Sequence, residues 1–392
     1  MKAVEKLIYF DYNSTTPVDP EVLKMMTPLL RNVFGNPSSN THKYGDEARM
    51  AVEKARIQIG RLINADTKNI ILTSSATESI NLALKGTFEA SKYNKDHIIT
   101  AQTEHNAVLD TCSYLESKGA RITYLPVNER GLIDLNSLKD AITKKTLLVA
   151  IMYANNETGV IQPINEITQI TNERNVLFMT DATQAVGKIP VDVETKNIDY
   201  LTFSAHKLYG IKGAGALYVR NLNKQKITPQ NHGGGHENGM RSGTANVPSI
   251  AAFGKACEIC IKRLESDMLY VSKLRDELES KCLSIGNSFV NGDMSQRLPN
   301  TTNICFNEID ADELILKIKN KIAVSTGSAC TSATFEPSHV LTAMGLTQNQ
   351  AYSSIRFSLG RFTSKKEIKQ AFSILDESIH MLREIHDFKQ YK

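Results

Sequence analysis

The sequence of 392 residues has no tryptophan, six cysteines and no apolar run near the ~20 residues that cross a membrane. The cysteines, at positions 112, 257, 260, 282, 305 and 330, are too sparse and irregular for a secreted disulfide framework. The apolar run near the N-terminus is too short for a signal peptide. We therefore expect a cytoplasmic protein with free thiols and no membrane partner.

Neither sign of charge dominates the sequence. It has 46 basic and 42 acidic residues, a formal net charge of +4, and no charged tail. This balance gives no support for direct nucleic-acid binding. The hydrophobic share of 41% is enough to bury a large core, and the length allows two or three domains.

What the sequence does have is a regular alternation of short apolar runs and helical patterns. The apolar runs at 70–72, 97–100, 121–126, 146–153, 176–180 and 200–203 are typical of strands. Strands that alternate with helices predict an α/β fold with a mostly parallel sheet covered by helices. Ligands of such sheets lie beyond the carboxyl ends of the strands, so polar residues that follow a strand are candidates for a functional site.

The pattern changes near residue 262. A long charged helix (262–281), a β-like segment (301–307) and a C-terminal helix follow, the last introduced by a capping box of Ser364 and Glu367. We expect a large domain at 15–261. The segments 1–14 and 262–392 should form a smaller α+β domain.

Asp181 and Lys207 are the first candidates for chemistry. Asp181 follows the strand at 176–180, and Lys207 follows the strand at 200–203, so both should reach the same sheet edge. Pyridoxal phosphate needs a lysine for its Schiff base and an acid for its ring nitrogen. Taken alone, Asp181 could simply cap the next turn.

Other polar residues at this edge fit the same cofactor. A helix beginning near Ala76 offers its N-terminal amides to a phosphate, with the hydroxyls of Thr77 and Ser204 as further donors, although a simple N-cap would look alike. His105 should stack on the ring and move protons. Asn155 and Asn156 fit either a turn or the site.

Three further segments carry candidate residues. Cys330 lies among small polar residues, where a thiol can be an exposed nucleophile. Arg356 can hold a substrate carboxylate or pair with a surface acid. The CxxC of Cys257 and Cys260 lies in a helical pattern and favours a helix face over a metal site.

The sequence resembles the pyridoxal-phosphate cysteine desulfurases of the NifS/IscS type, in the class V aminotransferase-like group of fold type I. The matching segments are YFDYNSTTPVDP, FGNPSSNTHKYG, SSATESIN, TEHNAV, NNETG, TDATQAVG, SAHKLYGIKGAGALY, GGGHENGMRSGTANV, GSACTSATFEPSHVL and SSIRFSLGRFT. The resemblance implies a large domain with a mostly parallel sheet of the seven-stranded type and a smaller α+β domain.

The resemblance also implies a role for each site residue. It gives Lys207 the covalent bond to pyridoxal 5'-phosphate, Asp181 the pyridine nitrogen and His105 a place stacked on the ring. Asn156 and Gln184 would contact the phenolic oxygen, and the helix start at Ala76 with Thr77, Ser204 and His206 would bind the phosphate. Thr244 would reach the phosphate from a partner subunit, which implies a homodimer. Asn36 and Arg356 would hold the substrate carboxylate.

The activity implied is conversion of L-cysteine to L-alanine, with the sulfur captured as a persulfide on Cys330. An acceptor protein, such as an iron-sulfur scaffold or a thiolation enzyme, would receive it. Asn106 stands where the family commonly has lysine, and by the resemblance we expect the C-terminus to stop short of the tail that docks a scaffold, so the acceptor stays open. Two alternatives remain: a transaminase or β-lyase that does not need Cys330, and a non-catalytic binding protein that would be colourless.

Overall fold

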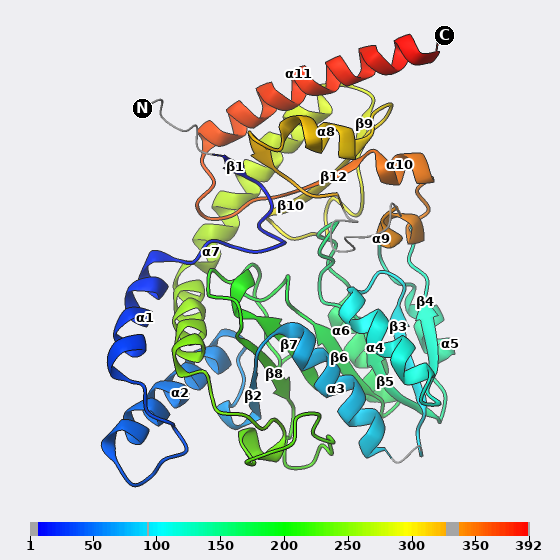
Figure 1. Cartoon of the computed structure of the whole chain (residues 1–392). Helices are drawn as coiled ribbons and strands as arrows, with labels where there is room; N and C mark the ends of the chain where they lie inside the picture. The colour runs from blue at the N-terminus through cyan, green and yellow to red at the C-terminus, as the bar shows by residue number, and fades with distance from the viewer. Residues whose placement is uncertain (1–6, 92–93, 327–336, 391–392) are drawn as a thin grey trace.

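The computed structural model describes residues 7–91, 94–326 and 337–390, with the side chains of 386–390 excepted. A seven-stranded sheet forms the centre of the large unit (Figure 1). Its order is β2 (Ile70–Thr73), β8 (Gly215–Val219), β7 (Tyr200–Ser204), β6 (Leu177–Asp181), β5 (Thr146–Ala150), β3 (His97–Ala101) and β4 (Arg121–Leu125).

The sheet is mostly parallel, as the sequence predicted. Strands β4, β3, β5, β6 and β7 run parallel to one another, and β8 is antiparallel to both β7 and β2. Most strand ends differ from the prediction by one residue, and the largest difference is in β5. The strand expected at 146–153 ends at Ala150, and β6 extends to Asp181. The alternation of apolar runs did not predict β8.

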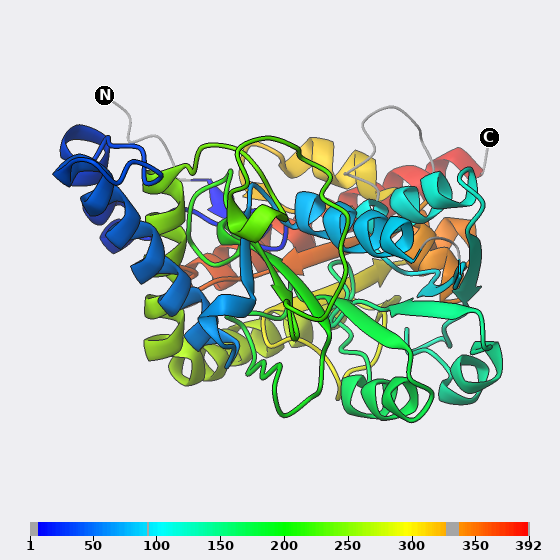
Figure 2. The same cartoon turned by 90° about the horizontal axis from the view of Figure 1, so that it is seen from below.

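Helices cover both faces of this sheet (Figure 2). α3 (Ala76–Ala90) and α4 (Asn106–Glu116) pack on one face, and α2 (Lys43–Leu62), α5 (Leu135–Ala141), α6 (Ile164–Glu173) and the start of α7 (Val247–Leu283) pack on the other. Successive side chains of a strand point to opposite faces, so Ile98 joins the first core and Ile99 the second. This double coverage explains why the strands read as continuous apolar runs.

The small unit contains a three-stranded antiparallel sheet at the other end of the molecule (Figure 1). Its order is β12 (Ser354–Ser358), β10 (Thr301–Phe306) and β9 (Ser288–Val290), covered by α8 (Ala311–Ile318) and α11 (Lys365–Gln390). The predicted capping box begins α11: Glu367 N donates to Ser364 Oγ at 3.2 Å, and Ser364 N donates to Glu367 Oε2 at 2.7 Å.

The N-terminal segment belongs to this small unit and then crosses to the large one. β1 (Ile8–Tyr9) pairs in parallel with β11 (Ile322–Ala323), and α1 (Pro20–Asn32) follows against α7. The remaining helices are α9 (His339–Ala343), α10 (Gln348–Tyr352) and the short 3₁₀ turns η1 (Thr67–Asn69), η2 (Ala205–Lys207) and η3 (Glu237–Gly239).

The longest helix, α7, runs from one unit into the other. Its 37 residues begin at Val247, well before the predicted start at 262, and its first half packs in the large core while its second half packs in the small one. Cys257 and Cys260 are both buried in it, as their helical pattern predicted. The expected domain boundary at 261/262 falls inside this helix and stays a prediction. No helix within the described ranges is long and apolar enough to cross a bilayer.

Candidate active site

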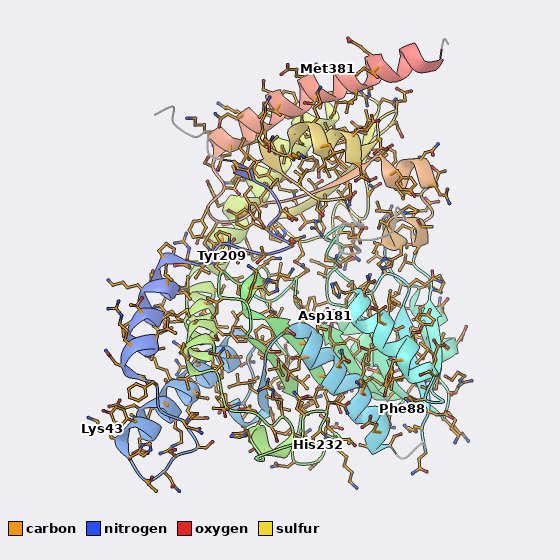
Figure 3. All side chains as sticks on the ribbon, viewed as in Figure 1. Lys43, Phe88, Asp181, Tyr209, His232 and Met381 are labelled. Atoms are coloured by element: carbon orange, nitrogen blue, oxygen red, sulfur yellow. The ribbon has the colours of Figure 1, made fainter. Side chains whose placement is uncertain are left out.

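A cavity of about 210 Å³ lies at the carboxyl ends of the parallel strands. Most of the residues predicted for a site line it: Ala76, Thr77, His105, Asn156, Asp181, Gln184, Ser204, His206, Lys207 and Arg356. They come from five loops of the large unit and, for Arg356, from β12 of the small unit. Asp181 marks this position near the middle of the molecule (Figure 3).

Lys207 is the last residue of η2, the short turn that follows β7. Its Nζ donates to the main-chain oxygen of Ser14 at 2.6 Å and to that of Asn13. The amine is therefore held at the cavity wall by the N-terminal segment, 194 and 193 positions away in the sequence.

Asp181 is the last residue of β6, on the strand next to β7. Its Oδ1 accepts from Thr183 N at 3.0 Å, Thr183 Oγ1 at 2.5 Å and Thr202 Oγ1 at 3.4 Å. The carboxylate thus caps the next turn, as its simplest interpretation held, and it also faces the cavity. Its fixed orientation suits a group that must receive one defined hydrogen bond from a ligand.

The N-terminus of α3 forms one end of the cavity. Ser75 is its N-cap and accepts from Glu78 N at 3.1 Å. Ala76 and Thr77, the first residues of this 15-residue helix, line the cavity, and the amides at a helix start favour an anion. A glycine makes this approach possible, because a Cβ on Gly215 of β8 would lie 2.6 Å from the Ser75 carbonyl carbon.

His206 lies beside this helix end. Burial, with the positive charges of Lys207, Lys212 and Lys188, lowers the pKa of His206 to about 4. The ring is therefore neutral at neutral pH, and its Nδ1 pairs with Thr15 Oγ1 at 3.1 Å. Helix amides, hydroxyls and a neutral imidazole together make a set of donors that suits a phosphate.

His105 is the N-cap of α4. Its Nδ1 accepts from Ala107 N at 3.0 Å, so the proton of the neutral ring lies on Nε2. The preceding Glu104 is fully buried, and burial raises the pKa of its carboxyl well above the usual value, ahead of a smaller contribution from Asp181. Its Oε1 accepts from Met152 N at 2.7 Å, which ties the His105 loop to the exit of β5.

Arg356 is buried in β12 and makes two contacts. Its Nη2 pairs with Asp11 Oδ1 at 2.7 Å, and its Nη1 donates to Asn156 O at 3.1 Å. Its buried Nε has no hydrogen-bond partner within the described part of the chain. The guanidinium therefore pairs with an acid, as the simpler alternative held, and keeps one donor for a ligand of the cavity.

The two asparagines of the NNETG segment have different roles. Asn155 Oδ1 accepts from Glu157 N at 2.8 Å and from Thr158 N at 3.0 Å, which closes a turn. Asn156 lines the cavity. The sequence pattern alone leaves both interpretations open for each asparagine, and the family resemblance implies a site role for Asn156.

The sequence reasoning missed Asp11 and Asn13 as individual residues. Asn13 is 1% exposed, and its main-chain oxygen accepts from both Lys207 Nζ and Gln184 Nε2. Its Nδ2 donates to Asn156 O at 3.1 Å and to Thr301 Oγ1 at 2.9 Å. The only signal for either residue was the YFDYNSTTPVDP segment of the family resemblance.

Two of the predicted site residues that the structure describes lie elsewhere. Thr244 and Asn36 are exposed and do not line the cavity of the single chain. Thr244 belongs to the loop between β8 and α7, which is braced by ion pairs of Arg241 with Glu78 and of Glu237 with Arg56, both at 2.7 Å. His232 of the same loop lies well away from Asp181 in Figure 3. Cys330 lies outside the described residues.

The described residues on either side of 327–336 are attached to the site. Before it, Ser325 O accepts from Arg356 N at 2.8 Å. After it, His339 Nε2 lies 3.0 Å from Glu104 O, and Ser338 Oγ donates to Glu157 Oε2 at 2.6 Å. Both ends are therefore anchored to residues in or next to the cavity wall.

The donors and acceptors of the cavity fit pyridoxal phosphate. A lysine and a carboxylate end neighbouring strands, and a helix N-terminus with hydroxyls closes the phosphate end. The orphaned Nε of Arg356 offers a donor to an acidic substrate.

Comparisons with known proteins agree with this chemistry. The family model described as aminotransferase class-V matches residues 8–371. A curated relative, cysteine desulfurase IscS of Neisseria meningitidis, is 49% identical over 382 residues, which cover 97% of this chain and 94% of the relative. The solved structure of a NifS-like protein has a TM-score of 0.90 at 38% identity and covers 96% of this chain and 100% of its own. SspA in complex with cysteine has a TM-score of 0.82 at 37% identity, with coverage of 91% and 100%.

Proposed function

The chain belongs to the aminotransferase class-V family and is a pyridoxal-phosphate-dependent cysteine desulfurase, and we propose that Cys330 receives the sulfur of the substrate. The observation that best supports this chemistry is that Lys207 and Asp181 follow or end neighbouring strands and line one cavity, where they can hold the cofactor. Lys207 would hold the cofactor, and Asp181 would hold the proton of its ring nitrogen.

Pyridoxal phosphate, when bound, supplies the electron sink that lets the carbon bonded to the substrate nitrogen lose its proton. Around it, Thr77, Ser204 and His206 would hold the phosphate with the amides at Ala76. Asn156 and Gln184 would contact the phenolic oxygen. The assignments are supported by the place of each residue on the cavity wall.

Two side chains are suited to moving protons. The amine of Lys207 would take the proton of the substrate carbon that is bonded to nitrogen. His105 would stack on the ring and exchange a proton at Nε2, since its Nδ1 is occupied by the Ala107 amide. Both roles use atoms that the fold already holds at the cavity.

The substrate carboxylate would bind Arg356. The buried Nε without a partner supports this role, because a carboxylate there would pair an orphaned donor. Asn36, the other residue assigned to this carboxylate, is exposed and outside the cavity, so its role rests on the sequence resemblance alone.

The sulfur step is balanced without an external oxidant. The Cys330 thiolate would attack the substrate sulfur, and a sulfur–sulfur bond would form as the carbon–sulfur bond breaks. The carbon that loses the sulfur would take the electron pair of that bond and a proton, and the carbon bonded to nitrogen would regain the proton that it gave up. The products are L-alanine and a persulfide on Cys330.

Replacement of Cys330 tests this assignment. Cys330→Ala should keep the coloured cofactor and bind cysteine but form no persulfide and almost no alanine. Mass spectrometry after addition of cysteine should place the extra sulfur on Cys330 in the parent protein. The matched control is Cys305→Ala, a buried thiol of β10 that should keep sulfur release. A persulfide on Cys257 or Cys260 that survives Cys330→Ala would overturn the proposal, and full sulfur release would favour a β-lyase.

We further propose a homodimer in which Thr244 completes the phosphate site of the partner. Its exposure outside its own cavity supports this role, as do the exposed apolar side chains of α1 and α2. The persulfide would pass to an acceptor protein, either an iron-sulfur scaffold or a thiolation enzyme. A cytoplasmic location is supported by the five described cysteines, which are all free thiols.

A further inference from the structure

A second lysine lies behind the wall of the site, in contact with two of its lining residues, and has no role in the proposed chemistry. Lys188 follows β6 by seven positions, in a turn closed by the bridge of Val186 with Ile189. Its Nζ donates to Gln184 Oε1 at 2.5 Å and to Asn13 Oδ1 at 3.2 Å. Both acceptors belong to residues that line the cavity.

These contacts define which way the Gln184 carboxamide points. One of its N–H groups donates to the main-chain oxygen of Asn13 at 3.0 Å, and its oxygen accepts from Lys188. The second N–H is left for a ligand of the cavity. A flipped amide would place its oxygen against the Asn13 carbonyl and its NH₂ group against the amine of Lys188.

The same amine also helps to hold Asn13. Asn13 Oδ1 accepts from Lys188 and from Asn300 Nδ2 at 3.0 Å, while its main-chain oxygen holds Lys207. Burial, with the charges of Lys207 and Arg356, holds the pKa of Lys188 well below its usual value, and the Cys260 thiol acts weakly in the opposite direction. The N–H groups of this amine are matched by the two oxygens that it contacts, Gln184 Oε1 and Asn13 Oδ1.

We propose that Lys188 is a positioning residue of the cofactor site, whose amine fixes the Gln184 carboxamide with an N–H directed into the cavity. This inference rests on the proposed contact of Gln184 with the phenolic oxygen of the cofactor. Lys188 does not touch the reacting atoms and acts through Gln184 and Asn13.

The visible absorbance of the holoenzyme reports on this arrangement without any turnover. The nitrogen that joins lysine to the cofactor can carry a proton, whose charge compensates the negative phenolic oxygen. When that proton is lost, the oxygen keeps its negative charge uncompensated, so a hydrogen-bond donor to the oxygen stabilises the deprotonated form. Loss of the donor therefore raises the pKa of this nitrogen, which is measured as the pH at which the visible band changes. In Lys188→Met we expect a rise of roughly 0.5–1 pH unit, the size of a partly lost hydrogen bond to a charged oxygen.

The matched control is Lys139→Met, which removes an exposed amine from α5 and should leave the band unchanged. Circular dichroism and thermal melting show whether Lys188→Met is folded. If it is not, Lys188→Gln, which keeps one donor, should give a smaller shift in the same direction. A folded variant at position 188 with the parent pKa overturns the inference.

A double-variant cycle separates this inference from the proposed function. Gln184→Ala should raise the pKa of the band, and adding Lys188→Met to it should produce no further rise, because the amide that Lys188 positions is gone. Additive shifts would show that Lys188 acts independently and would overturn its positioning role. No shift in Gln184→Ala would instead overturn the cofactor contact of Gln184, and the inference with it.

Discussion

His97, in β3, shows how one buried side chain makes the stability of this protein depend on pH. The residue is 1% exposed, and its ring lies between Thr146 Oγ1 at 2.8 Å and Thr123 Oγ1 at 2.9 Å. Burial, and secondarily the charge of Arg121, lowers its pKa to about 4. The unfolded ring has a pKa of about 6.5, so between these values the unfolded chain binds a proton that the folded chain does not. Stability from His97 is thus complete above pH 6.5 and is lost as the pH falls toward 4.

We expect this histidine to lower the free energy of unfolding by roughly 1–2 kcal/mol between pH 7 and pH 5. His97→Gln keeps a polar side chain for the threonines but cannot be protonated, so its loss of stability over this range should be smaller by that amount. Urea unfolding of parent and variant at both pH values measures the difference. Equal losses in the two proteins would show that His97 does not titrate as expected. The pKa of His206 is also lowered to about 4, so His206 should still contribute its own pH-dependent part of the stability in the variant.

The residues predicted from the sequence were those that follow a predicted strand. Asp181 and Lys207 could be placed at one sheet edge because the carboxyl ends of parallel strands meet there, and the structure brings both to one cavity. Asn13 had no such signal. Its partners Thr301 and Ser358 are 288 and 345 positions away, and no local pattern encodes contacts at that separation.

Among the elements, β8 was the strand that the alternation of apolar runs did not predict. It is preceded by Gly213 and begins at Gly215, and these small residues look like a turn. Its antiparallel direction also breaks the alternation of strand and helix. Gly215, one of the residues that made the strand look like a turn, is required by packing, because it lets β8 approach the N-cap of α3.

Gly215→Ala should therefore weaken cofactor binding. The added methyl group would lie 2.6 Å from the Ser75 carbonyl carbon. Because that carbon belongs to the main chain, the clash can be relieved only by a shift of the start of α3. We expect at least about a tenfold rise in the cofactor dissociation constant, or ~1.4 kcal/mol, measured by visible absorbance. The control is Gly234→Ala, where the nearest atoms belong to the movable ring of His236. Parent-like affinity in folded Gly215→Ala would contradict this account.

At the scale of the whole molecule, one surface of the large unit carries exposed apolar side chains. Phe34 is 70% exposed, and Leu30 and Met50 are each 63% exposed, in and around α1 and α2. Isolated exposed apolar residues are common, but several together indicate an interface. These helices lie at one end of the molecule in Figure 2.

We expect Phe34→Asp to weaken the proposed homodimer, because it places a charge where apolar surface would be buried. Light scattering should show a dimer for the parent and a larger monomer fraction for the variant, which should also bind the cofactor less tightly if Thr244 comes from the partner. The control is Leu316→Asp on α8, equally apolar and 62% exposed but in the small unit. A parent that is monomeric at working concentration would contradict the dimer.

The hydrogen bonds of Asn13 also have a consequence for biosynthesis. Asn13 leaves the ribosome 345 residues ahead of its partner Ser358. At about 5–20 residues per second, this interval lasts roughly 20–70 s. During translation the nascent chain can fold β2 to β8 while Lys207 still lacks the completed wall around Asn13. The cavity wall is therefore complete only after β12 has been made, and a chain truncated before β12 should lack the contacts of Arg356 with Asp11 and Asn156.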